Sequence, residues 1–364
     1  MARERIENID GLRGLAAISV IFGHSLEMMV KNFHLPPILH TSILDGDLLY
    51  FSPGRLGVVA FFCISGLVIP FSFSGEKPLI NFLISRFFRL YPAYWFSLAV
   101  ALLILPNLGA GHFNFNQIIA NISMIQFALK QKDILGVYWT LFIEILFYTI
   151  CFFSSFARIL HSRLFNFLAM SVFTALALAG GAYRYTHPMS TISIGVFTYL
   201  AAMHFGTLTR ILYLEGQRGG RRLFAGALTV LLVGVIAANT LGYVHAQDKT
   251  TGWVASNTSY VFAIGLFLAC VRFRLFRQPT LLFFGAISYS LYLIHPIFIE
   301  ISQYYLGSLG AGIAAPLSFL IITGGSFTAA TLMRKLIEQP AIRVGKRISR
   351  SLGKGHTSAG PIET

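Results

Sequence analysis

The sequence predicts an all-α fold: a polytopic membrane protein of about ten transmembrane helices, with both termini in the cytoplasm. Composition is the first observation behind this prediction. Of the 364 residues, 55% are apolar and only 12% are charged, whereas a soluble domain carries about 25% charged residues. The mean hydropathy of +0.69 is typical of a chain that has the bilayer as its solvent. This composition argues against intrinsic disorder and against nucleic-acid recognition.

Apolar runs are the second observation. A helix that crosses a bilayer needs about 20 apolar residues, and ten runs of about that length follow one another along the chain. They are 10–31, 54–74, 86–105, 138–157, 164–183, 190–210, 222–242, 254–272, 280–303 and 312–334. We therefore expect one integral-membrane domain over 1–350 and a disordered cytoplasmic tail over 351–364.

The third observation is the placement of Lys and Arg. Of the 28 basic residues, 22 fall in the segments on the side of the termini and 6 in the alternate segments. Because basic residues collect on the cytoplasmic side, both termini are expected there, and the net charge of +14 reflects topology. The first run lacks a cleavage site and is interpreted as a retained helix. The longest outer connection, 106–137, is a candidate for a segment that dips back towards the membrane.

Ionisable side chains inside a membrane are costly and mark candidate functional positions. Arg13 and His24 are eleven residues apart, which is three helical turns to within about 20°, so they share one face about 16 Å apart along the axis. Arg13 would lie at the cytoplasmic rim as an anion anchor, and His24 in the outer half of the bilayer as a base. The alternatives are a snorkelling arginine and a histidine that is hydrogen-bonded to a neighbouring helix.

Two further residues are expected at the depth of His24. Glu144 would lie about 10 Å below the outer surface, and His295 about 22 Å from the cytoplasmic start of its helix. A carboxylate beside His24 would orient the imidazole and raise its basicity. Pro296 frees a carbonyl next to His295, and Tyr292 adds a hydroxyl. The alternatives are an interhelical acceptor for Glu144 and a histidine at a helix kink for His295.

The segment 85–95, SRFFRLYPAYW, lies where the third run enters from the cytoplasm. Arg86 and Arg89 are three residues apart and share a helix face. With Tyr91 and Trp95 they would bind phosphates and stack on a base. The alternative is an ordinary positive-inside anchor with an aromatic belt.

Small residues stand in the middle of the second run. Ser65 and Gly66 would let a helix or a ligand approach closely, and we favour packing as the explanation. Cys63, Cys151 and Cys270 lie far apart in apolar runs without metal-ligand or redox spacing. No metal site is predicted.

Five segments together resemble the membrane acyltransferase-3 family, whose bacterial members O-acylate cell-surface and secreted glycans. They stand in the family's order from about residue 8 to residue 298: IDGLRGLAAISVIFGHS, FFCISGLVIP, FLISRFFRLYPAYW, VYWTLFIEILFY and ISYSLYLIHPIF. The resemblance implies a multi-pass protein of the bacterial inner membrane with no permanently bound cofactor. It implies acyl-CoA, usually acetyl-CoA, as cytoplasmic co-substrate and an exported or lipid-linked sugar as acceptor. The remaining partners are membrane lipids.

In the resemblance, Arg13 and His24 match the arginine and histidine taken as essential. Arg86, Arg89, Trp95 and Glu144 match positions also linked to function, and His295 lies in a matching segment. The expected catalytic residues are His24, as base or transient acyl acceptor, Glu144 and Arg13. The expected acyl-CoA-binding residues are Arg86, Arg89, Tyr91 and Trp95. The expected acceptor-binding or supporting residues are His295, Ser65 and Tyr292.

Two alternatives to an enzyme stay open from the residues alone. A ten-helix transporter or flippase would also use intramembrane His and Glu, as a proton relay. The two halves of the chain show no repeat of the kind that many transporters have. A non-catalytic scaffold in a glycan-assembly complex would have no reason to place ionisable side chains at matched depth.

Overall fold

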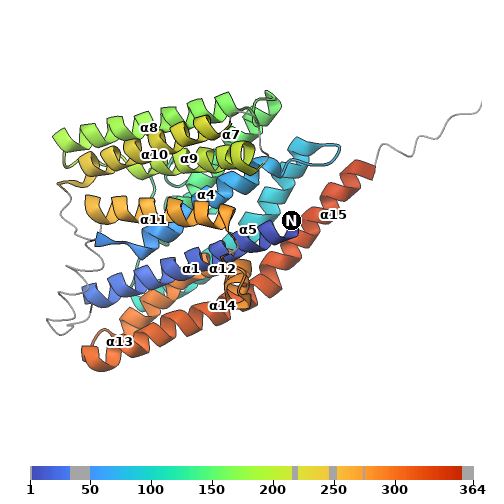
Figure 1. Ribbon diagram of the computed structural model, residues 1–364. Coiled ribbons are helices and arrows are strands. Elements are labelled where there is room, and N and C mark those ends of the chain that lie inside the picture. The colour runs from blue at the N-terminus through green and yellow to red at the C-terminus, as the bar shows by residue number, and fades with distance from the viewer. Residues whose placement is uncertain (1, 33–49, 215–219, 246–251, 274, 355–364) are drawn as a thin grey trace, which may run out of the picture.

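The computed structural model describes residues 2–32, 50–214, 220–245, 252–273 and 275–354, and it forms a bundle of helices with no strand in those ranges (Figure 1). The α-helices are α1 (Ala2–Asn32), α4 (Pro53–Val68), α5 (Pro78–Ile104), α6 (Phe115–Ile122), α7 (Trp139–Phe156), α8 (Arg163–Thr186), α9 (Ile194–Leu208), α10 (Gly220–Tyr243), α11 (Trp253–Arg272), α12 (Pro279–Leu306), α13 (Ala311–Leu320), α14 (Ser326–Met333) and α15 (Gln339–Lys354). Several helices begin at a residue that favours a helix N-terminus. The Ser52 side chain caps α4, and proline opens α4, α5 and α12, as expected for helix N-termini.

The all-α membrane fold is confirmed. In the described part of the chain, nine helices are long and apolar enough to cross a membrane, and each coincides with one predicted run. The tenth run, 190–210, corresponds to α9, whose 15 α-helical residues continue as a six-residue π-helix, Thr209–Leu214. Twelve of the α9 residues are buried, because α4, α8 and α10 pack around this helix.

Close approaches between helices depend on glycine. A Cβ at Gly66 would lie 1.8 Å from the Met203 carbonyl oxygen of α9, so the prediction that this position serves packing is confirmed. The same holds where α1 crosses α12: a Cβ at Gly285 would lie 1.9 Å from the Asp10 oxygen, and one at Gly14 2.1 Å from that of Leu281. Backbone contact at the second crossing places the polar side chains of α1 and α12 close together.

The long outer connection folds back onto the bundle. Residues 123–138 bring Met124, Gln126 and Tyr138 into fully buried positions. The Tyr138 hydroxyl lies 3.0 Å from Ser97 Oγ of α5, and the Tyr94 hydroxyl donates to the Asn121 carbonyl at 2.6 Å. Helix α7 therefore begins inside the bundle.

The last predicted run belongs to a much longer helical segment. Helices α13, α14 and α15, joined by π-helical turns, run for 42 residues from Ala311 to Leu352. At 1.5 Å per residue this is about 63 Å, roughly twice the hydrocarbon thickness of a bilayer. The α15 end projects beyond the bundle on the side of the N-terminus (Figure 1). The domain boundary expected at residue 350 thus falls inside a helix, and residues 355–364 of the expected tail lie outside the described residues.

Candidate active site

Five helices line a cavity of about 80 Å³ in the middle of the bundle. Its polar lining includes Arg13 of α1, Ser65 of α4, Glu144 of α7, and Ser288 and Tyr292 of α12. Apolar side chains, among them Phe61, Phe62 and Leu90, complete the wall. The structure therefore brings together four residues that the sequence singled out from four separate segments.

One face of α7 supplies a row of polar groups to this cavity. Thr140, Glu144 and Tyr148 are four residues apart and therefore lie above one another. The Thr140 hydroxyl lies 2.9 Å from the Tyr292 hydroxyl, and the Tyr148 hydroxyl donates to Glu144 Oε1 at 2.5 Å. The guanidinium of Arg86 lies 5.6 Å from the centre of the Tyr148 ring. The row thus joins the cavity to the arginines of α5.

The expected pairing of Glu144 with His24 is wrong. Glu144 accepts from Tyr148 and acts electrostatically on Arg13. The reason is the buried connection before α7: the Tyr292 hydroxyl donates to the Val137 carbonyl at 3.3 Å, so α7 starts at the level of Tyr292 instead of at the outer surface. Glu144 lies more than one turn further in, towards the end of the cavity that Arg13 lines.

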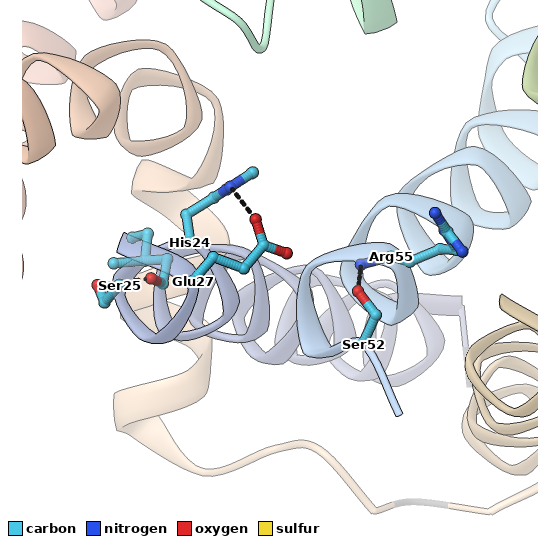
Figure 2. Close-up of polar contacts among 6 residues, drawn as sticks. His24, Ser25, Glu27, Ser52 and Arg55 are labelled. Carbon is cyan, nitrogen blue, oxygen red and sulfur yellow. Dashed lines mark hydrogen bonds and ion pairs between the residues drawn. The ribbon is translucent and has the colours of Figure 1, made fainter. Parts of the chain in front are cut away.

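The carboxylate beside His24 comes from its own helix. Glu27 Oε2 lies 3.8 Å from His24 Nδ1, and the two side chains are 37% and 27% exposed; Figure 2 shows them turned towards one another on α1. At 3.8 Å the two groups form an ion pair when His24 is protonated. With its proton on Nδ1, neutral His24 would keep a lone pair on Nε2, as a general base or a nucleophile requires.

His295 packs directly against His24. The two imidazole rings are stacked with centroids 5.4 Å apart, and the Tyr292 ring lies 5.9 Å from that of His295. His295 Nδ1 donates to the carbonyls of Leu291 at 3.2 Å and Tyr292 at 2.9 Å. Its Nε2 is buried and has no hydrogen-bond partner among the described residues. The line from Tyr292 through His295 to His24 connects the cavity with the exposed face of His24.

Two of the four expected acyl-CoA ligands, Tyr91 and Trp95, contact the end of α6. The Tyr91 hydroxyl donates to the Ser123 carbonyl at 3.1 Å, and the Trp95 indole donates to that of Ile122 at 3.0 Å. Helix α5 starts at Pro78, eight residues before the predicted run. Tyr91 and Trp95 are therefore about 20 and 25 Å from its start, where they hold the end of α6 instead of lining an entrance.

The arginines of α5 lie at the end of the cavity that Arg13 lines. Arg86 lies over the rings of Phe82 and Tyr148, at 5.7 and 5.6 Å from their centres. Arg89 acts electrostatically on both Asp10 and Arg13. Two arginines on successive turns thus face the end of the cavity that Arg13 lines.

Three acidic or hydroxyl groups near the site were not among the residues expected from the sequence. Glu27 follows His24 by three residues, a spacing that places both on one helix face and that was a usable signal. Tyr148 follows Glu144 by four in the same way. Glu338 is buried at 5% exposure and accepts from Ser290 Oγ at 2.7 Å. It lies outside the predicted runs, so only the fold reveals that it reaches the neighbourhood of Arg13.

A further arginine, Arg55, lies across α4 from His24. Gly23 and Gly54 meet where α1 crosses α4, so His24 and Arg55 stand at one level, and in Figure 2 Arg55 extends away from His24. Arg55 donates to Ser256 Oγ and lies 5.6 Å from the centre of the Tyr243 ring. Its contacts are therefore with α10 and α11 and not with the histidines.

In the part of the chain that the structure describes, no three His, Cys, Asp or Glu side chains form a group that could hold a metal ion. Cys63, Cys151 and Cys270 are buried and unpaired, and Cys270 Sγ donates to the Asn8 carbonyl at 3.3 Å. The three cysteines thus lie inside the bundle.

Comparison with known proteins bears on the chemistry of this site. The profile of the acyltransferase-3 family, described as an acyltransferase domain, matches residues 6–335. Nodulation protein 10 from Rhizobium leguminosarum bv. viciae is 25% identical over 381 aligned positions, which cover 93% of this chain and 93% of that protein. No solved structure matches significantly. The matched region contains every residue that lines the central cavity and ends before α15.

Proposed function

The chain belongs to the acyltransferase-3 family of membrane acyltransferases, and from that premise we propose that it transfers an acyl group, with acetyl as the first candidate, from cytoplasmic acyl-CoA to a hydroxyl of an exported or lipid-linked sugar. The observation that carries the proposal is a row of neighbouring polar side chains through the bundle. It runs from Arg13 and Glu144 in the cavity, past Tyr292 and His295, to His24. A transferase whose donor and acceptor lie on opposite sides of a bilayer needs such a path.

The two ends of the path suit different halves of the reaction. At the inner end, Arg13, Arg86 and Arg89 supply guanidinium groups, the groups that bind phosphates best, and Arg13 is held by Asp10 at 4.0 Å. At the outer end, His24 is partly exposed and is paired with Glu27. The acyl chain and the thioester would occupy the cavity between them, where Phe61 and Phe62 provide apolar contact.

His24 would act through Nε2. The nitrogen takes the proton of the acceptor hydroxyl while the oxygen attacks the thioester carbonyl carbon. The carbon–sulfur bond then breaks, and the proton passes from His24 to the departing sulfur, which leaves an ester and free CoA thiol. Glu27 holds the tautomer and stabilises the imidazolium. A transient acyl group on His24 Nε2 is the other route by which the same residue would serve.

Inverted membrane vesicles given radiolabelled acetyl-CoA test the proposal. We expect label to enter a glycan or lipid with the wild-type protein and not with His24→Ala, and the labelled product identifies the acceptor. His187→Ala is the matched control, because His187 is an exposed histidine whose contacts are the neighbouring Tyr183 and Thr186. Equal incorporation by wild type and His24→Ala would contradict the proposal and favour the transporter alternative.

A further inference from the structure

A second hollow opens at the end of the bundle where α15 projects. It has a volume of about 550 Å³ and lies between α5, α15 and the turn that precedes α5. From α15, its lining comprises Ile342, Gly345, Lys346, Ser349 and Arg350. These residues follow the spacing of a single helix face, so one side of α15 is turned towards the hollow.

The packing of α15 on α5 forms this groove. Gly345 lies against Phe88, where an added Cβ would stand 2.8 Å from the Phe88 Cβ. Helix α15 continues the long C-terminal helix out of the bundle (Figure 1). The cations on its groove face are therefore turned towards α5.

The chemistry of the groove suits a phosphorylated, aromatic ligand. Lys346 and Arg350 are one turn apart on its wall, and among the described residues neither forms an ion pair. Glu76 on the opposite rim is the acidic lining residue. Phe88 offers a half-buried ring. Asn81 Oδ1 is buried without a hydrogen-bond partner in the described structure, which leaves an acceptor for an amino group.

Helix α5 stands between this groove and the central cavity. Its residues Ser85 and Phe88 line the groove, while Leu90, about 200° round the helix from Phe88, lines the cavity. Arg89 and Arg86, at about 100° and 160° from Phe88 in the same sense, lie between these two faces. A ligand bound in the groove would therefore extend an arm round α5, past these arginines, towards Glu144 and Arg13.

We propose that this groove binds the 3′-phosphorylated adenosine diphosphate end of acyl-CoA, with its phosphates on Lys346 and Arg350 and its adenine against Phe88. The inference rests on the proposed function, in which acyl-CoA is the donor, and assigns a binding role to α15, which lies beyond the matched family region. The pantetheine arm then enters along α5, and Tyr91 and Trp95 are not needed as ligands.

The test uses the full-length protein in detergent and adenosine 3′,5′-bisphosphate as the probe, measured by calorimetry. We expect wild type to bind the probe and Lys346→Ala/Arg350→Ala to bind at least tenfold more weakly, since charge-assisted contacts are lost. Arg343→Ala/Arg347→Ala is the matched control, because it removes the same charge from exposed α15 positions that do not line the groove. Lys346→Arg/Arg350→Lys should retain binding.

Kinetics separate this inference from the proposed function. The groove variant should raise the KM for acetyl-CoA at least tenfold at unchanged kcat, and leave the KM for S-acetylpantetheine, which lacks the nucleotide, unchanged. Equal effects of the groove and control variants, or no probe binding by wild type, would overturn the groove assignment even if acyl transfer proceeds. Probe binding that depends on Lys346 and Arg350 in a protein without transferase activity would support the groove and refute the proposed function. Displacement by phosphatidylglycerol vesicles but not by CoA would identify a lipid-headgroup site and overturn the inference.

Discussion

Glu27→Gln tests whether the carboxylate beside His24 supports this residue in acyl transfer. That carboxylate belongs to Glu27 and not, as the sequence predicted, to Glu144. The change keeps the shape of the side chain and removes its charge 3.8 Å from His24 Nδ1. Two unit charges at that distance interact by about 1 kcal/mol in water and about 4 kcal/mol at an effective dielectric constant of 20. Since both side chains are about one-third exposed, solvent screening favours the lower part of that range, about 1–2 kcal/mol. Stabilisation of the imidazolium by this amount corresponds to a 5- to 30-fold lower kcat.

The assay is acetyl transfer in proteoliposomes at saturating acetyl-CoA. Glu27→Gln should lower kcat by that factor and leave the KM for the donor unchanged, because the donor's charged end lies far from His24. Glu144→Gln serves as the comparison: its carboxylate acts on Arg13, so its loss should act mainly on donor binding. The reasoning fails if Glu27→Gln retains full kcat while Glu144→Gln alone loses it, since Glu144 would then be the partner of His24.

Three further predictions follow from packing and burial. Gly285→Ala should destabilise the protein by about 1–3 kcal/mol and lower its thermal unfolding midpoint, because the added Cβ would stand 1.9 Å from an α1 carbonyl oxygen. Gly226→Ala is the control: nothing lies within 4 Å of its added Cβ, so the midpoint should stay unchanged or rise. Trp95→Phe should lower the stability by about 1 kcal/mol, because the indole hydrogen bond is lost. The KM for acetyl-CoA should stay unchanged, and a raised KM would show that Trp95 does bind the donor. Burial raises the pKa of Asp133, so its carboxyl group holds a proton more firmly in the folded than in the unfolded state, and stability should fall as pH rises from the ordinary aspartate range through the raised pKa. Unfolding followed against pH checks this, and Asp133→Asn should abolish the dependence.

The membrane fold could be predicted because lipid leaves few alternatives. Every backbone polar group in the hydrocarbon core must be satisfied within the chain, so each long apolar run must be a helix. All ten runs coincide with helical segments, and α9 differs only in that its π-helical continuation interrupts regular α-helix. The orientation of the termini stays a prediction from the basic residues.

The site was predictable where its residues share a helix and much less so where they do not. Ser65 and Tyr292 were singled out as polar groups in apolar runs, and both line the cavity. The depth of Glu144 depended on where α7 begins, and that is fixed by contacts between the preceding connection and α12. Hydropathy carries no information on such contacts. The same error displaced Tyr91 and Trp95, since α5 starts eight residues before its apolar run.

The helical period and the interhelical crossings thus contribute differently to the site. The period alone places Arg13 and His24 on one face of α1, and it also places Glu27 beside His24 without help from any other helix. The position of His295 against His24, by contrast, requires α1 and α12 to cross at backbone contact, which only the glycines at that crossing permit. A substitution at Gly285 should therefore separate the two imidazoles while the pairing of His24 with Glu27 persists. If transfer needs only the α1 pair, a folded Gly285 variant keeps its activity; if it needs the stacked histidines, activity falls although every polar residue is still present.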